Sequence, residues 1–572
     1  MSPTFHLASL TGLLALTACA TAAGSASGQR PVADEIPSSI SGQSAYGLFL
    51  AGQSAIDQGQ GGDAADYFAK AENAAGGSDA PLVQTHVFTA ALLAGDVKQA
   101  AQIAPVAEQD PSIRHLAALT IAVEDMASGR GAKARAQLAT IGPPYNAAAA
   151  LLVPLAAAEA GDNEAAIALP VIEGDPVAGF SASIDQGLIF ERLGRFDEAE
   201  TALRALVQRG DPGAVASADL GAFLERRGRW ADAVAIYDQA LTRLPGDATL
   251  LADRVRAASH HGAPAMPSLK ETASEALTAS ASVLVIRREE EGALAYLRLA
   301  LRLDPDRDSA WLLVGDILSD VGDKADARAA FQAPKPGSLA FVSARDKLAW
   351  SYQGDAQKDQ ALQIARSTLD AEPGSKEAAT NLADILRADE RYDESVGVLD
   401  RLIATEGGAP DWRLLYMRAV DYQQSDHWGE AERDLTLALK ESPDEPELLN
   451  FLGYTWIDRG EKLHEALAMV QKAVNTNPKS GAMIDSLGWG YYRLGDYQTA
   501  VDKLEQAVSI EAGDPDVNNH LGDAYWRVGR RIEARYQWSR VLTLEPDAKL
   551  KTEVEAKLKS GLGPINTPSS GS

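Results

Sequence analysis

A repeat of about 34 residues is the feature that most constrains this chain. Between residues 446 and 546, each repeat carries a Leu-Gly pair, followed by a second glycine, a small residue and a bulky residue. The pairs are 35 and 34 residues apart, at Leu452–Gly453, Leu487–Gly488 and Leu521–Gly522. A fixed period of this length with this order of residues predicts an array of helical hairpins.

The small residues explain why such hairpins form. Gly488 is expected on the first helix of its unit and Ala500 on the second, so the two backbones approach closely and bulky residues fill the remaining space. Gly495 can adopt the left-handed conformation of the turn. Pro478 cannot continue a helix and directs the chain into the next unit. Because one hairpin cannot bury its apolar face alone, the expected fold is all-α, an α-solenoid of stacked hairpins.

The period can be followed from Ala45 to Ala548, which corresponds to about 15 units. Two units, around residues 114–142 and 146–173, are rich in alanine and poor in aromatic residues, so their pattern is degenerate. The stretch 248–280 carries Pro264 and Pro267, which predicts helices with a kink or a long loop. We therefore expect an N-terminal array over 45–247, an irregular segment over 248–280 and a C-terminal array over 281–559.

The middle unit of the opening stretch resembles the tetratricopeptide repeat (TPR) family. The family's pattern is matched at Leu487, Gly488, Tyr491, Gly495, Tyr497, Ala500, Leu504 and Ala507. The resemblance implies a superhelix of TPR-like units whose first helices line a concave binding face. It implies a fold and a mode of binding, and leaves the partner open.

Composition and motifs argue against nucleic-acid binding and catalysis. With 80 acidic and 53 basic residues the net charge is −27, which disfavours binding to phosphate backbones. The sequence has no G-x-S-x-G, no Gly-rich phosphate loop before a Lys-Ser/Thr pair and no H-E-x-x-H motif. His260 and His261 are expected in a polar loop, and His464 and His520 at the surface or in the groove. We expect no enzymatic activity, no cofactor and no metal site.

The N-terminus predicts export. An apolar run from Leu7 to Ala18 is too short to span a membrane and has the length of a signal-peptide core, so residues 1–18 are expected to be a signal peptide. The sequence Leu-Thr-Ala-Cys ending at Cys19 resembles a bacterial lipobox, which implies cleavage before the cysteine and its acylation. Because only His6 and no Lys or Arg precedes the run, an ordinary secretory signal or a misplaced start codon remains the alternative.

The residues around the array extend this interpretation. Ala20, in place of Asp, resembles lipoproteins sorted to the outer membrane, so we expect a lipid anchor on its periplasmic face. Residues 19–44 are rich in Ala, Gly and Ser and are expected to form a flexible tether. Residues 560–572 are expected to form a disordered tail.

Near the C-terminus, residues of the first helices that do not pack on neighbours are candidates for binding a protein partner. They combine aromatic rings, amides and guanidinium groups, which anchor interfaces and bind a peptide backbone. The candidates are Asn450, Tyr454, Asp485, Trp489, Tyr492, Arg493, Asn519, Asp523, Trp526 and Arg527. Trp489 and Trp526 each follow a packing position, so packing in the core is the alternative for both.

The combination of lipobox, tether and array is similar to lipoproteins that bind carboxyl-terminal processing proteases. Its most specific motif is D-S-L-G-W-G-Y-Y-R-L-G-D-Y over residues 485–497. The resemblance implies a non-enzymatic scaffold that recruits and activates a periplasmic processing protease and gathers its substrates. The alternative is a structural component of an outer-membrane or polysaccharide export or assembly machine. A hydrolase with an appended array is disfavoured, because no stretch outside the period has the ~50 residues of a domain.

Overall fold

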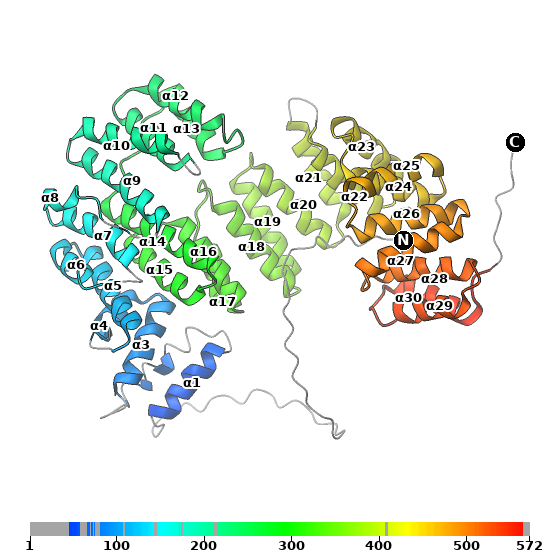
Figure 1. Cartoon of the computed structure of the whole chain (residues 1–572), viewed down its shortest axis with the longest axis horizontal. Helices are drawn as coiled ribbons and strands as arrows, with labels where there is room; N and C mark the ends of the chain where they lie inside the picture. Colours follow the sequence, from blue (N-terminus) through cyan, green and yellow to red (C-terminus); the bar gives the residue numbers. More distant parts are fainter. Residues whose placement is uncertain are drawn as a thin grey trace. The chain divides into compact units, whose positions relative to one another are not determined.

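The computed structural model is built from helical hairpins, which confirms the predicted all-α solenoid (Figure 1). It describes residues 45–57, 66–68, 70–71, 74, 80–106, 109–141, 146–170, 172, 175–210, 214–405 and 410–563, and none of these forms a strand. The expected signal peptide, Cys19, the tether and most of the tail lie outside these ranges. Two compact units meet between Ile364 and Ala365, inside α19 (Lys358–Ala371).

The N-terminal unit contains the helices before α19. They are α1 (Ala45–Asp57), α3 (Ala80–Ala94), α4 (Val97–Ile103), α5 (Pro111–Ala127), α6 (Gly131–Leu138), α7 (Asn146–Glu159), α8 (Asn163–Ala166), α9 (Pro176–Arg192), α10 (Phe196–Arg209), α11 (Val215–Arg226), α12 (Trp230–Leu241), α13 (Ala248–Ser259), α14 (Leu269–Ile286), α15 (Glu290–Leu303), α16 (Asp308–Asp320), α17 (Lys324–Gln332) and α18 (Phe341–Gly354).

The C-terminal unit contains the helices after α19, which pair consecutively and stack hairpin on hairpin. They are α20 (Lys376–Ala388), α21 (Tyr392–Thr405), α22 (Trp412–Gln424), α23 (Trp428–Glu441), α24 (Pro446–Arg459), α25 (Leu463–Thr476), α26 (Gly481–Leu494), α27 (Tyr497–Ile510), α28 (Pro515–Arg527), α29 (Arg531–Val541) and α30 (Ala548–Ser560).

A glycine on the first helix of a hairpin makes room for a bulky side chain of the second. A Cβ atom on Gly488 would lie 2.7 Å from Leu504, and one on Gly522 would lie 2.5 Å from the ring of Trp538. The bulky residue thus sits directly against the glycine, 16 positions later in the chain. This close contact explains why glycine recurs with the period, because any side chain at this point would overlap the second helix.

The same contact predicts opposite effects for two Gly→Ala substitutions in the N-terminal unit. A Cβ on Gly221 would clash with the ring of Tyr237, which is buried and donates a hydrogen bond of 2.7 Å to Glu225 Oε1. We expect Gly221→Ala to lower the stability by about 1–3 kcal/mol. Gly179, inside α9, has nothing within 4 Å of its Cβ position, so Gly179→Ala is expected to raise it by up to about 1 kcal/mol. Thermal unfolding followed by circular dichroism measures both, and two shifts of the same sign would contradict the packing argument.

One hairpin of the N-terminal unit leaves the sequential stack and packs inside it. Helices α14 and α15 lie against α3, α5, α7 and α9, far earlier in the chain (Figure 1). Arg298 Nε donates to Leu93 O at 2.8 Å, Lys270 Nζ donates to Ala127 O at 2.7 Å, and Arg302 pairs with Glu124 at 2.8 Å. The hairpin therefore covers the face that the first helices of these units would otherwise leave open.

This inner hairpin explains the degenerate pattern of the alanine-rich units. Helix α7 contacts its neighbours in the stack on one side and α14 on the other. Its leucines Leu151, Leu152 and Leu155 are all buried, and runs of small alanines flank them on both sides. A helix that is apolar all round is a buried helix, so the aromatic signature is replaced by small residues that fit between two layers.

The stretch 248–280 is where the chain turns inward. It comprises α13, a non-helical stretch over residues 260–268 that contains Pro264 and Pro267, and most of α14. His260 ends α13 in the left-handed conformation with φ of 55° and stacks on Trp230, with the ring centroids 5.2 Å apart. Helices joined by a long loop were expected here, and the structure adds that the loop carries the chain from the stack to its interior.

Candidate functional site

The ten candidate residues lie on three consecutive first helices of the C-terminal unit. These helices pack on one another, α24 on α26 and α26 on α28, and the side that carries the ten candidates is here termed the inner face. Asn450 and Tyr454 are on α24; Asp485, Trp489, Tyr492 and Arg493 are on α26; Asn519, Asp523, Trp526 and Arg527 are on α28. Equivalent positions recur in successive first helices with the period of the repeat, as at Asn450, Asp485 and Asn519. The sequence could therefore place these residues on the helices.

Trp489 lies at the centre of a stack of rings. Its ring centroid is 4.2 Å from that of His520 and 4.5 Å from that of Tyr492, and both pairs are nearly parallel. The side chain is only 8% exposed, yet its indole Nε1 has no hydrogen-bond partner in the described part of the chain. A buried donor without a partner costs about 1–3 kcal/mol, so this N–H is a group that a ligand could satisfy.

His520 was expected at the surface or in the groove, and the structure places it buried on the inner face. It is 2% exposed, and its Nδ1 lies 2.9 Å from Asp485 Oδ2. Burial lowers the pKa of His520, but Asp485, with smaller contributions from Asp516 and Asp523, outweighs this and raises the pKa to about 9. His520 is therefore a buried cation at neutral pH, and it donates its Nδ1 hydrogen to Asp485.

Asn519 and Asp523 are engaged by the last helix. Lys557 of α30 donates to Asn519 Oδ1 at 2.9 Å and to Asp523 Oδ2 at 2.8 Å. Trp538 Nε1 donates to the other oxygen of Asp523 at 2.9 Å. All these polar atoms are paired within the protein, because α30 packs where a further repeat would stack.

Trp526 and Arg527 also lie at this closed end. The ring of Trp526 is 5.3 Å from that of Trp538, lies under the guanidinium of Arg531 at 3.8 Å and contacts Gly561 just after α30. Arg527 donates to Tyr492 Oη at 3.2 Å and to Gly563 O at 2.8 Å. Both side chains thus hold the end of the stack together.

Four polar groups on the inner face have no partner among the described residues. Asn450 is 4% exposed and its Oδ1 accepts no hydrogen bond, and the Nε1 of Trp489 is the second such group. The hydroxyl of Tyr454 and the carboxylate of Asp516 make no hydrogen bond or ion pair within the described ranges. Burial, opposed by His520 and assisted by Asp514 and other carboxylates, raises the pKa of Asp516 to about 6.

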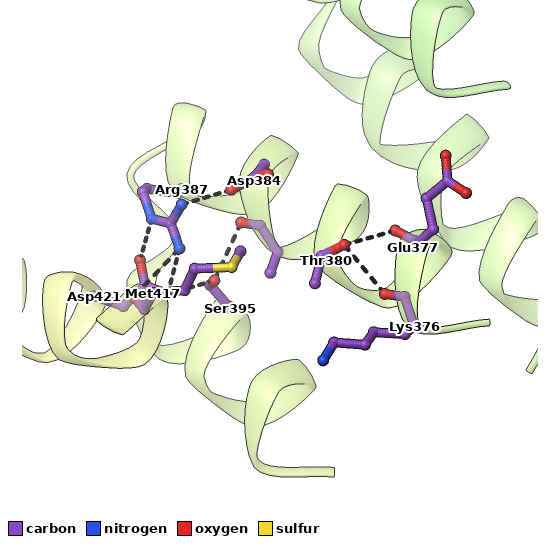
Figure 2. A network of polar contacts seen from close by, with 9 residues as sticks. Lys376, Glu377, Thr380, Asp384, Arg387, Ser395, Met417 and Asp421 are labelled. Carbon is purple, nitrogen blue, oxygen red and sulfur yellow. Dashed lines mark hydrogen bonds and ion pairs between the residues drawn. The ribbon is translucent and has the colours of Figure 1, made fainter. Parts of the chain in front are cut away.

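A polar network at the beginning of the C-terminal unit was not anticipated from the sequence (Figure 2). Arg387 Nε donates to Asp421 Oδ1 at 2.7 Å, and Arg387 Nη1 donates to Asp384 Oδ1 at 2.6 Å. Ser395 donates to Asp421 Oδ2 at 2.6 Å and also to Ala383 O. The network joins α20, α21 and α22, and its role is structural.

The sequence does contain a pattern that could have predicted this network, namely complementary polar residues separated by one repeat length. Arg387 and Asp421 are 34 residues apart, and other pairs between successive first helices have nearly the same separation. Arg226 and Glu191 pair at 2.7 Å, Arg493 donates to Asp458 O at 2.5 Å, and each of these separations is 35 residues. Complementary polar residues one repeat apart therefore predict contacts between successive first helices.

The described part of the chain contains no cluster of three or more His, Cys, Asp or Glu side chains that could hold a metal ion. Nor does any helix in these ranges combine the length and apolarity needed to cross a bilayer.

Comparisons with known families identify the repeats. Models described as tetratricopeptide repeat match residues 184–248 and 347–410, and a TPR repeat model matches residues 490–529. A TPR repeat-containing protein of Pseudomonas aeruginosa is 36% identical over 113 residues, 20% of this chain and 19% of that protein. Cellulose synthase operon protein C of Escherichia coli is 27% identical over 184 residues, 29% of this chain and 16% of that protein. The chain spans less than a fifth of the length of these relatives.

Two solved structures show a partial similarity to the chain. A tetratricopeptide repeat protein from Parabacteroides merdae has a TM-score of 0.37 and 14% identity, and covers 44% of this chain and 97% of its own. The anaphase-promoting complex assembly Cut9–Hcn1 has a TM-score of 0.37 and 16% identity, and covers 90% of this chain and 96% of its own.

Proposed function

Because this chain is a tetratricopeptide repeat protein and such repeats are scaffolds for protein interactions, we propose that it binds its partners on the inner face of α24, α26 and α28. The observation that carries this proposal is the pair of buried, unsatisfied groups on that face, Trp489 Nε1 and Asn450 Oδ1. A donor and an acceptor of this kind match the carbonyl and amide of a partner's main chain.

The N-terminal unit supports the same assignment by contrast. There the corresponding face of α3, α5, α7 and α9 is covered by α14 and α15 of the same chain. No such internal hairpin packs on α24, α26 and α28 in the described ranges. An array whose inner face is already filled has little surface for a partner, so binding is assigned to the C-terminal unit.

Trp489→Ala should reduce partner capture at least tenfold, since a buried indole at the centre of an interface is a typical hot spot. The measurement is affinity capture from solubilised envelopes by the full-length chain, followed by mass spectrometry. Trp489→Phe keeps an aromatic ring beside Tyr492 and His520 but removes the N–H together with the second ring of the indole, so it is the milder variant for separating lost binding from lost folding. Trp350→Ala, at an exposed tryptophan of the N-terminal unit, is the control. Equal capture by all four proteins would remove the inner face from the proposal.

We further propose that the scaffold is a lipoprotein anchored through Cys19 to the periplasmic face of the outer membrane. The support is the sequence Leu-Thr-Ala-Cys at the end of an apolar run, in a chain with a single cysteine. Cys19→Ser should move the protein from the membrane fraction to the soluble periplasmic fraction, because acylation supplies the anchor. The same distribution for variant and wild type would contradict the anchor.

The partner proposed first is a periplasmic carboxyl-terminal processing protease with its substrates, by the resemblance in residues 485–497. A second candidate is a part of a polysaccharide export or assembly machine, favoured by the similarity to cellulose synthase operon protein C. The capture experiment distinguishes them, since the first requires a protease among the proteins lost with Trp489→Ala and the second requires envelope assembly components.

A further inference from the structure

The groups left without a partner on the inner face include one carboxylate, that of Asp516. Asn450 Oδ1 accepts hydrogen bonds, and so does the carboxylate of Asp516 when it is ionised. Trp489 Nε1 can only donate one. The hydroxyl of Tyr454 can do either. A ligand that pairs with Asp516 must therefore bring a donor, and a positively charged donor forms the strongest pair.

The cations of this region are engaged within the protein. His520 pairs with Asp485, and Lys557 binds Asn519 and Asp523. Arg493 donates to a backbone carbonyl of α24, and Arg527 donates to Tyr492 and to the backbone after α30. None of these contacts reaches Asp516, so its charge is not compensated by a direct contact in the described chain.

The pKa of Tyr454 reflects the acidic character of this face. Burial raises the pKa of the Tyr454 phenol, and Asp458, Asp485, Asp516 and Asp514 raise it further. These carboxylates come from α24, α26 and the beginning of α28, so three successive repeats direct negative charge at one aromatic side chain. A cation placed beside an aromatic ring and a carboxylate is stabilised by both.

We propose that this part of the inner face binds an extended segment of a partner protein through a Lys or Arg side chain, which pairs with Asp516. The main chain next to that side chain binds the indole N–H of Trp489 through a carbonyl and the Asn450 oxygen through an amide. This inference rests on the proposed function, because it assumes binding on this face, and it adds the chemical class of the segment.

The test is selection of a displayed library of random peptides on the immobilised full-length chain. We expect the selected peptides to be enriched in Lys or Arg, and Asp516→Asn to weaken the binding of a selected peptide about tenfold in titration calorimetry. Asp502→Asn, at an exposed carboxylate of α27, is the matched control because it removes the same charge away from the inner face. We expect its affinity to equal that of the wild type.

The other outcomes separate the two proposals. Neutral or acidic selected peptides whose binding needs Trp489 but not Asp516 would overturn the basic side chain and leave the binding face intact. Equal weakening by Asp516→Asn and Asp502→Asn would reduce the effect to the net charge of the chain and would also overturn it. Peptides whose binding is unaffected by Trp489→Phe, Asn450→Ala and Asp516→Asn would overturn the binding face as well.

Discussion

Arg387→Ala is expected to lower the stability of the C-terminal unit by about 3–5 kcal/mol at pH 7. The substitution leaves Asp421 buried, with 0% of its side chain exposed, and Ser395 as its remaining side-chain partner among the described residues (Figure 2). A buried carboxylate that loses its counter-ion keeps its desolvation cost and loses the attraction that offset it. Denaturant unfolding followed by tryptophan fluorescence is a suitable measurement, because six of the nine tryptophans follow residue 365.

Two further variants show whether burial decides the size of this effect. Asp384 binds the same guanidinium at 2.6 Å, but its side chain is 39% exposed, so Asp384→Ala should cost no more than about 1 kcal/mol. The double variant Arg387→Met/Asp421→Leu removes both charges and should recover most of the loss. Similar losses for Arg387→Ala and Asp384→Ala would show that the low exposure of Asp421 does not control the energy.

The expected loss also depends on pH in a way that a general packing defect would not. Burial raises the pKa of Asp421, although Arg387 and Ser395 oppose this rise. Without Arg387 the pKa should rise further, so Asp421 becomes protonated at mildly acidic pH and the buried charge disappears. The stability gap between Arg387→Ala and the wild type should therefore narrow as the pH falls.

The repeat fold was predictable because its determinants are local and recur. The contact of Gly488 with Leu504, like that of Gly522 with Trp538, joins positions 16 residues apart in one hairpin. Gly495, placed at a turn from the sequence, has a φ of 88°, as the left-handed conformation requires. The same pattern of glycines and bulky residues recurs in many repeats, so a departure from it in one unit does not hide the period.

The inner hairpin could not be predicted, because it depends on contacts between distant segments. Arg298 reaches Leu93 across 205 residues, and Arg302 reaches Glu124 across 178 residues. The alanine-rich composition of two units is a consequence of this packing. From the sequence it was interpreted only as a degenerate repeat pattern. Their composition indicated a helix buried on two sides, but nothing local indicated which helix covers the second side.

The period of the repeat located the candidate residues on their helices. The burial and the hydrogen-bond partners of each residue depend instead on side chains that pack against it. Alignment of the repeats placed all ten residues on α24, α26 and α28. It could not anticipate that Lys557, on a helix after the last clear repeat, engages Asn519 and Asp523. Whether these residues bind a partner remains a prediction, and the structure favours Asn450 and Trp489 because their polar atoms are still unpaired.

Raising the pH from about 6.5 to above 9 is expected to destabilise the C-terminal unit by about 3 kcal/mol through His520 alone. The pKa of His520 is about 9 in the folded chain, against an ordinary value of 6.5. A group whose pKa is raised on folding contributes its stability fully below the unfolded pKa, and the contribution is lost as the pH rises through the folded pKa. In His520→Gln the side chain does not titrate, so unfolding followed by tryptophan fluorescence should show a much flatter dependence over this window. Equal slopes for the two proteins would mean that the pKa of His520 is not raised on folding.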